Sequence, residues 1–151
     1  MELFRISLDK YAGALTASGA ENRWNVAGQT VLYTGSSRSL STLELVVHRS
    51  AIQPTQNYKV MVISVADEDR LVQQVQIRDL PARWRKMSAY PALQKIGSDW
   101  YRKKETLLLK VPSSVIVQEY NYLINVTHPD FATMVKLIRT EDYFWDGRLL
   151  S

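Results

Sequence analysis

The sequence predicts an α+β fold in a single domain that spans residues 1–151. Segments with strand-like and helix-like composition follow one another without the regular strand–helix–strand alternation of a doubly wound sheet. The chain has 151 residues, 46% of them hydrophobic, which is enough for one domain with a sizeable core. The two common glycine-rich phosphate-binding motifs are missing from the chain.

The first half of the chain predicts three strands and one helix. Residues 36–50 have the apolar spacing of a helix, and Ser36 or Ser37 is suited to cap its N-terminus. The strands alternate in hydrophobicity or are rich in β-branched residues, and they are expected at residues 3–7, 30–34 and 58–65.

The second half begins with a strand and continues with a basic segment from Pro81 to Glu105, of which residues 92–102 are expected to be helical. A strand that follows this segment stops at Pro112, which cannot donate a ladder hydrogen bond. The remaining elements are expected to be strands at 71–77, 106–111, 115–120 and 122–126, a loop and helix within 128–139, and an aromatic tail at 140–150 that packs on the body.

Glu44 lies on the apolar face of the predicted helix. At about 100° per residue, Leu40, Leu43 and Val47 form one stripe, and Glu44 falls within about 40° of Leu40. A carboxylate that points toward a core needs a cation, a set of donors or a polar cavity, because burying it unpaired is costly. Two interpretations remain open: a helix-edge residue that reaches water or pairs with His48 or Arg49 on the next turn, or a carboxylate at the bottom of a ligand pocket.

Arg23 presents a similar choice. An arginine among packing groups either stacks on Trp24 or pairs with an acid, or its guanidinium holds a phosphate or pyrophosphate. Tyr33 ends an apolar strand and is either a core residue or an aromatic wall for a planar ring. Ser113 directly follows Pro112, where it either makes a turn or delivers a hydroxyl into a cleft.

Composition and charge further limit the possible functional classes and partners of the protein. A net charge of +4 is compatible with an anionic ligand, a nucleic acid or an acidic protein partner. No apolar run approaches the roughly 20 residues that span a bilayer, and the missing secretory signal and cysteines favour the cytoplasm. His48 and His128 have no neighbouring ligands, so no metal site is expected. A serine hydrolase is disfavoured because the nucleophile-elbow motif does not occur.

Several blocks of the sequence resemble the RES-domain family, whose members are usually toxins of bacterial RES–Xre toxin–antitoxin modules. These blocks are FRIS, RWN…G…VLYT, LELVVH, LPARWR, LLLKVPSSVIVQEYNYLINVTHPDF and DGRLL, and their order and spacing agree over nearly the whole chain. The arginine, glutamate and serine that give the family its name match Arg23, Glu44 and Ser113.

The resemblance implies a fold similar to ADP-ribosyltransferase toxins, with a split, mostly antiparallel sheet and a cleft that holds NAD. It implies an enzyme that consumes NAD as substrate, as a glycohydrolase or a phosphorylase, with no separate cofactor and no metal. Transfer of ADP-ribose to a protein is the alternative. The implied partner is an Xre-type antitoxin that blocks the cleft, in a homodimer or a toxin–antitoxin hetero-oligomer.

The resemblance also implies roles for individual residues. Glu44 stabilises the positive charge that builds on the ribose as nicotinamide leaves. Arg23 holds the pyrophosphate or the nicotinamide-side phosphate, and Tyr33 flanks the nicotinamide ring. Ser113 hydrogen-bonds the ribose or the nicotinamide amide. The remaining residues implied to line the cleft are Trp24 and Asn25.

The chain departs from the family pattern just before the RWN block. The family often has two small residues there, and this chain has Glu21 and Asn22. A side chain at these positions limits close backbone approach to a ligand, and Glu21 adds a negative charge beside the expected phosphate site.

A non-catalytic binding module is a further alternative. Cations and aromatic residues interleave in RDLPARWRKM and GSDWYRKK, as they do in nucleic-acid sites. The competing interpretation places Trp84 and Trp100 in the core and the charges on a solvated face or a protein-binding surface, so direct nucleic-acid binding is not expected.

Overall fold

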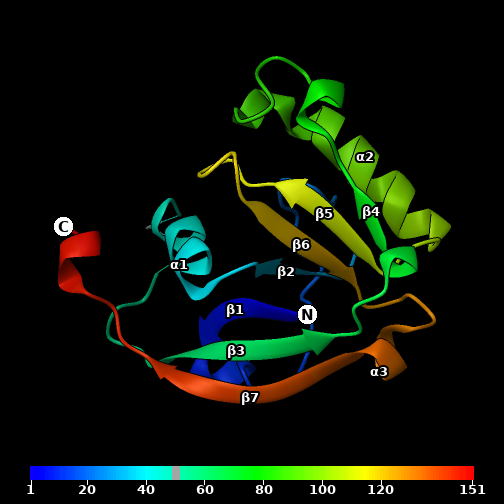
Figure 1. Cartoon of the computed structure of the whole chain (residues 1–151). Helices are drawn as coiled ribbons and strands as arrows, with labels where there is room; N and C mark the ends of the chain where they lie inside the picture. The colour runs from blue at the N-terminus through cyan, green and yellow to red at the C-terminus, as the bar shows by residue number, and fades with distance from the viewer. Residues whose placement is uncertain (49–51) are drawn as a thin grey trace.

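The computed structural model describes residues 1–48 and 52–151, and within these ranges seven strands form one sheet (Figure 1). The strand order is β4-β5-β6-β2-β1-β3-β7. The strands are β1 Glu2–Leu8, β2 Val31–Gly35, β3 Tyr58–Val65, β4 Val72–Gln74, β5 Leu108–Pro112, β6 Tyr120–Asn125 and β7 Val135–Tyr143. The helices are α1 Arg38–Val46, α2 Tyr90–Lys103 and α3 Phe131–Met134.

The sheet is split between its two central strands. β1 and β2 pair only where Phe4 lies opposite Gly35, whereas β1–β3, β2–β6 and β3–β7 pair over most of their lengths. All neighbours are antiparallel except β4 and β5. The expected α+β fold with a split, mostly antiparallel sheet is therefore confirmed.

The first helix covers the break in the sheet. Ser37 caps α1, with its hydroxyl accepting from the backbone N–H of Leu40 at 3.0 Å, as one of the two predicted caps. The hydroxyl of Ser41 donates to the carbonyl of Phe4 at 3.0 Å, which ties the helix to β1. Figure 1 shows α1 beside the ends of β1 and β2. The helix ends at Val46, and residues 49–50 of its expected range lie outside the described residues.

The second helix packs on the other half of the sheet. Its inward face carries Leu93 and Trp100, which join a core cluster with Trp24 and Trp84. Gly97 lies against the backbone of the loop before β2: a Cβ there would meet the carbonyl oxygen of Trp24 at 1.7 Å. The loop that carries the RWN block is therefore pressed onto α2.

Two predicted elements are wrong. Residues 115–119 form turns rather than a strand, because the hydroxyl of Ser113 accepts the backbone N–H groups of Val115 and Ile116. The helix predicted to follow a loop within 128–139 is confined to Phe131–Met134. The rest enters β7, because pairing with β3 outweighs the local helical spacing.

Smaller differences follow from packing. Val47 is 56% exposed rather than part of the buried stripe of α1. The predicted 71–77 strand is shorter, as β4 ends at Gln74. The aromatic tail does pack on the body, with the ring of Trp145 edge-on to Tyr58 and Tyr143. No helix within the described residues is long and apolar enough to cross a membrane.

Candidate functional site

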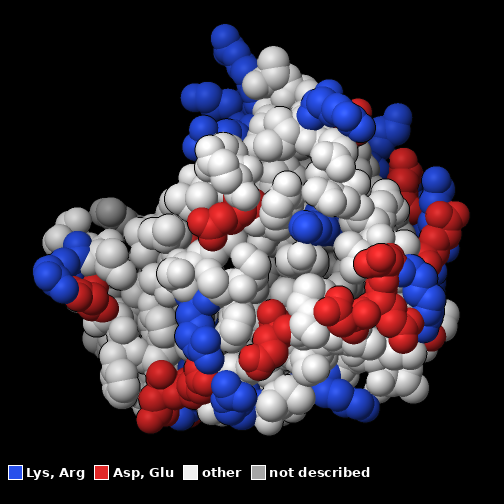
Figure 2. Space-filling model, viewed as in Figure 1, with Lys and Arg blue, Asp and Glu red and all other residues white. Residues whose placement is uncertain are grey.

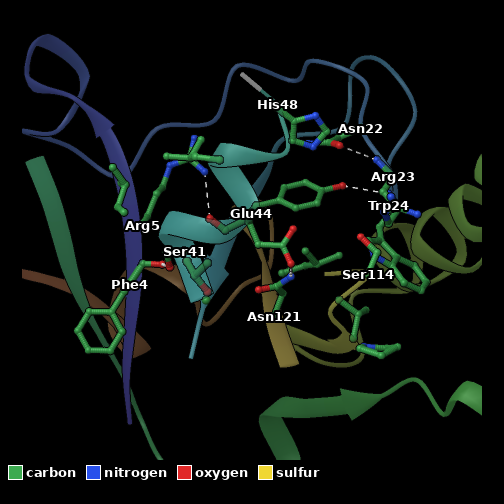
Figure 3. Close-up of a pocket in the computed structure, with 18 residues that line it drawn as sticks. Phe4, Arg5, Asn22, Arg23, Trp24, Ser41, Glu44, His48, Ser114 and Asn121 are labelled. Atoms are coloured by element: carbon green, nitrogen blue, oxygen red, sulfur yellow. Dashed lines mark hydrogen bonds between the residues drawn. The ribbon is translucent and has the colours of Figure 1, made fainter. Parts of the chain in front are cut away.

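A cavity of about 270 Å³ opens where the sheet splits (Figure 3). Its walls come from β1, β2, α1, the loop before β2, and the neighbouring ends of β5 and β6. Among the residues predicted to act, four line it together: Arg23, Trp24, Tyr33 and Glu44. The break in the backbone ladder therefore creates the space in which these side chains meet.

Glu44 presents one carboxylate oxygen to the protein. Its Oε1 accepts from the hydroxyl of Ser113 at 2.6 Å and from Nδ2 of Asn121 at 2.8 Å. No hydrogen bond to its Oε2 is found within the described residues. The carboxylate points from α1 toward Asn121 on β6 (Figure 3). The position of Glu44 on the helix requires a cation, a set of donors or a polar cavity for its carboxylate. The structure provides both a set of donors and a polar cavity.

Ser113 lies behind Glu44 and is fully buried, outside the cavity wall. Its hydroxyl oxygen accepts from the backbone N–H groups of Val115 and Ile116, each at 3.0 Å. The hydroxyl proton is therefore directed at Glu44, and the serine fixes the carboxylate from the protein side.

Asn121 is a site residue that the sequence did not single out. It lies on β6 opposite both Gly35 of β2 and Val111 of β5, and its side chain reaches the cavity. Its one local signal is a polar residue at the start of the apolar strand YNYLIN. Its partner Glu44 is 77 residues away in the chain, so the sequence does not reveal the contact.

Two hydrogen bonds occupy the hydroxyl of Tyr33, so the ring is the part of this side chain that faces the cavity. The hydroxyl donates to Oδ1 of Asn25 at 2.6 Å and accepts from the backbone N–H of Trp24 at 3.1 Å. Burial raises the pKa of Tyr33 and keeps it neutral. Asn25 is itself buried and does not line the cavity, and its amide donates to the carbonyls of Ala20 and Val26.

Arg23 lies at the edge of the cavity and binds the segment before α2. Its Nη1 donates to the carbonyls of Trp84 and Arg85, each at 3.2 Å, and its guanidinium stacks over the ring of Tyr90 at 4.9 Å. Arg23 therefore neither stacks on Trp24 nor pairs with an acid among the described residues.

Arg5 is the second site residue that the sequence did not single out. Its Nη1 donates to the carbonyl of Tyr33 at 3.0 Å and so bridges β1 to β2 where backbone pairing stops. Burial lowers the pKa of Arg5, because desolvation disfavours the charged form. Within the described residues no carboxylate lies in ion-pair distance of it. Its sequence signal is an arginine between Phe4 and Ile6.

The histidines do not gather ligands. His48 lies at the exposed end of α1 and lines the cavity, whereas His128 is buried and its Nδ1 accepts the backbone N–H of Asp130 at 3.0 Å. Within the described residues no three His, Asp or Glu side chains gather in a way that could hold a metal ion.

Together these residues make a site with opposite charges on its walls. Glu44 on α1 contributes an oriented carboxylate, Tyr33 on β2 an aromatic ring, and Arg5 on β1 a guanidinium that has no ion-pair partner among the described residues. Such a site suits a ligand that carries both an anionic group and a centre at which positive charge develops. The fold and the site thus define a split-sheet protein with a cleft whose walls carry both a carboxylate and a guanidinium.

Comparison with known proteins assigns this protein to a family. The RES domain model matches residues 2–146, so the chain belongs to the RES-domain family. The chain is 33% identical over 153 residues to Toxin Res of Yersinia enterocolitica, covering 99% of each. It is 34% identical over 143 residues to the Prs ADP-ribosylating toxin of a Sphingobium species, covering 92% of this chain and 88% of that protein.

A solved structure shares the fold. The M. tuberculosis MbcT–MbcA toxin–antitoxin complex contains a chain that superimposes with a TM-score of 0.73 at 17% identity, covering 95% of this chain and 84% of that chain. At this identity the likeness concerns the fold.

Proposed function

We propose that this chain is the toxin of a toxin–antitoxin module and that it consumes NAD by cleaving the bond between nicotinamide and ribose. The observation that carries the proposal is the Glu44 carboxylate, whose Oε1 is fixed by Ser113 and Asn121 while its Oε2 has no protein partner among the described residues. The names of the relatives support the toxin class. A cognate antitoxin is the expected partner.

The chemistry requires little beyond electrostatics. As the C1′–N bond breaks, nicotinamide takes the bonding electron pair and leaves neutral, and the ribose becomes an oxocarbenium-like cation. The oriented Glu44 carboxylate stabilises that charge. Water then gives ADP-ribose and a proton, and inorganic phosphate gives the phosphorylated ADP-ribose. No general acid is needed for the leaving group.

The other walls fit the remaining parts of NAD. Arg5 and Arg23 offer guanidinium groups to the pyrophosphate, and Arg5 uses fewer of its donors within the protein. The ring of Tyr33 flanks the nicotinamide, since its hydroxyl is already occupied. The cavity is slightly smaller than the roughly 300 Å³ of the smaller ligand pockets, so it suits the nicotinamide-ribose end of the dinucleotide.

The decisive experiment is product analysis by mass spectrometry. The purified chain is incubated with NAD, with and without inorganic phosphate, and we expect free nicotinamide together with ADP-ribose or its phosphorylated form. Intact NAD under both conditions contradicts NAD degradation by the isolated chain.

Glu44→Gln tests the carboxylate itself. Turnover is expected to fall about a hundredfold or more, because the amide removes the negative charge that stabilises the cation. Glu105→Gln is the matched control, since Glu105 is exposed and outside the cavity. Near-normal turnover of Glu44→Gln, with circular dichroism unchanged, would remove Glu44 from the chemistry.

A second candidate is transfer of ADP-ribose to a protein. The observation that favours it is the 34% identical relative named as a Prs ADP-ribosylating toxin. The same cleft would serve both reactions, with a protein side chain replacing water or phosphate at C1′. Incubation of labelled NAD with cell lysate, followed by a search for labelled protein, distinguishes the two.

A further inference from the structure

A basic hollow adjoins the cavity and has no part in the chemistry proposed above. It is lined by Arg83, Arg85 and Lys86, here called the basic rim, together with Ala82 and Ser114. Ser114 also lines the cavity, so the two openings share a wall. Figure 2 shows Lys and Arg side chains gathered at the top of the molecule, over the segment that leads into α2.

The cations of the basic rim are not neutralised by the protein. Elsewhere on the surface, cations such as Arg38, Arg70 and Arg148 lie within ion-pair distance of carboxylates. None of the three rim cations does so among the described residues, and all three are exposed. Their positive field is therefore free to attract an anionic partner.

The basic rim is held in a fixed position. Trp84 lies within it and is only 5% exposed, which anchors the segment to the core. The carbonyls of Trp84 and Arg85 accept from Arg23, and Nε of Arg85 donates to the carbonyl of Ser114 at 2.8 Å. A partner that binds here meets a preorganised surface, which lowers the ordering cost of binding.

The side chains near the basic rim favour a protein as its partner over a nucleic acid. Proteins that bind single-stranded nucleic acids use exposed aromatic rings for stacking, but Trp84, the aromatic residue interleaved with the basic rim, is 5% exposed. The exposed residues nearby in the chain are instead Met87, 77% exposed, and Ile77, 44% exposed. Methionine and arginine together are typical of protein interfaces.

We propose that the basic rim binds an acidic segment of another protein, with apolar residues of that segment on Met87. Because the hollow and the cavity share Ser114, a segment seated there lies at the edge of the cavity beside Arg23. Binding of an acidic segment depends on the exposed charges of the basic rim and on the shape of the hollow, and it does not require NAD to be the substrate.

The test is a binding measurement on the whole chain. A fluorescent peptide of alternating Glu and Leu is titrated by anisotropy at low and at physiological salt, beside an oligothymidine of equal charge. We expect the peptide to bind more tightly than the oligonucleotide. Arg83→Gln/Lys86→Gln is expected to weaken peptide binding about tenfold; these two side chains make no hydrogen bond or ion pair within the described residues, so the fold should persist.

The matched control is Lys103→Gln/Lys104→Gln, which removes the same charge at the far end of α2, roughly 20 Å from its start. Its peptide affinity should match that of the unmodified chain. Equal weakening by both double variants would mean that only net charge attracts the peptide and would overturn the proposal. Absent peptide binding, or tighter binding of the oligonucleotide, would overturn it as well.

Discussion

A single glutamate oxygen links three elements of this chain. Oε1 of Glu44 on α1 accepts hydrogen bonds from the hydroxyl of Ser113, which follows β5, and from the amide of Asn121 on β6. Two donors on one oxygen fix the plane of the carboxylate and orient the second oxygen, which has no hydrogen-bond donor among residues 1–48 and 52–151. We therefore expect the hydroxyl of Ser113 and the amide of Asn121 to act on the proposed reaction by positioning Glu44.

Asn121→Ala tests this positioning role. Loss of a hydrogen bond to a charged group costs about 1.5–3 kcal/mol, so we expect kcat for NAD to fall about 10- to 100-fold with little change in KM. Steady-state kinetics measure the split, and Asn57→Ala is the control because Asn57 is exposed and outside the cavity. A rise in KM alone would indicate direct substrate contact instead.

The two cavity arginines should respond differently to lysine. Arg5→Lys is expected to raise KM for NAD about tenfold, because lysine loses the two-pronged phosphate contact. Arg23→Lys should also weaken NAD binding and should in addition loosen the segment that accepts its hydrogen bonds at Trp84 and Arg85. Calorimetric titration of NAD into the Glu44→Gln background measures affinity without turnover, and unchanged affinity in both variants would exclude them as phosphate ligands.

At the scale of elements, α2 determines where the RWN loop lies. Gly97 allows the helix to approach the carbonyl of Trp24 more closely than any side chain permits. Trp24 in turn supplies the backbone N–H that holds Tyr33. The position of the aromatic wall thus depends on a glycine on a different element.

Gly97→Ala is therefore expected to be strongly destabilising. Its Cβ would lie 1.7 Å from a backbone oxygen, so the helix or the loop must move, at a cost of about 3 kcal/mol, the upper end for overpacking. Urea unfolding measures the change. Gly147→Ala is the control, since a Cβ there meets nothing within 4 Å. Similar stabilities of the two variants would mean that the helix shifts without cost.

The elements also show how much of the fold local sequence patterns can predict. The strand at 58–65 was predicted to the residue, because β-branched residues dominate it and both neighbours pair with it. The first part of β7, up to residue 139, was predicted as helix, since the spacing of apolar residues in 128–139 also suits a helix. Only its pairing with β3, some seventy residues earlier in the chain, distinguishes the two.

The same limit applies to the site. Glu44, Arg23 and Tyr33 follow from sequence blocks and line one cavity. Arg5 and Asn121 were not singled out, because a lone polar residue in an apolar strand does not reveal its partner. Each finds that partner on an element that is distant in sequence, so folding itself defines their roles.

At the scale of the whole molecule, an ion pair joins the first helix, α1, to the last strand, β7. Arg38 at the start of α1 makes a two-pronged contact with Glu141 of β7 at 2.8 and 2.9 Å, and Arg139 adds a third hydrogen bond. Hydrogen bonds from Arg38, then from Arg139, lower the pKa of Glu141 from 4.5 to about 2. Because the folded pKa lies below the unfolded one, this contact stabilises the fold above pH 4.5 and ceases to do so as pH falls to about 2.

Glu141→Gln should therefore lower Tm slightly at neutral pH, since the carboxylate is partly exposed and its ion pair is screened by solvent. The Tm difference from the unmodified chain should shrink from pH 4.5 downward and vanish near pH 2. Calorimetric scans across this range measure it. A difference that stays constant with pH would show that the contact acts through packing and not through charge.

The strand order also places the first three strands in the middle of the sheet and the last four at its two edges. A cut between β3 and β4 leaves β1, β2, β3 and α1 in one fragment and the flanking β4, β5, β6 and β7 in the other. Glu44 then belongs to the first fragment, and both of its donors, Ser113 and Asn121, belong to the second. Neither fragment holds a complete site, so neither is expected to show the proposed toxin activity by itself. Reassembly of the two would restore the site, which makes the fold a natural template for a two-input genetic switch.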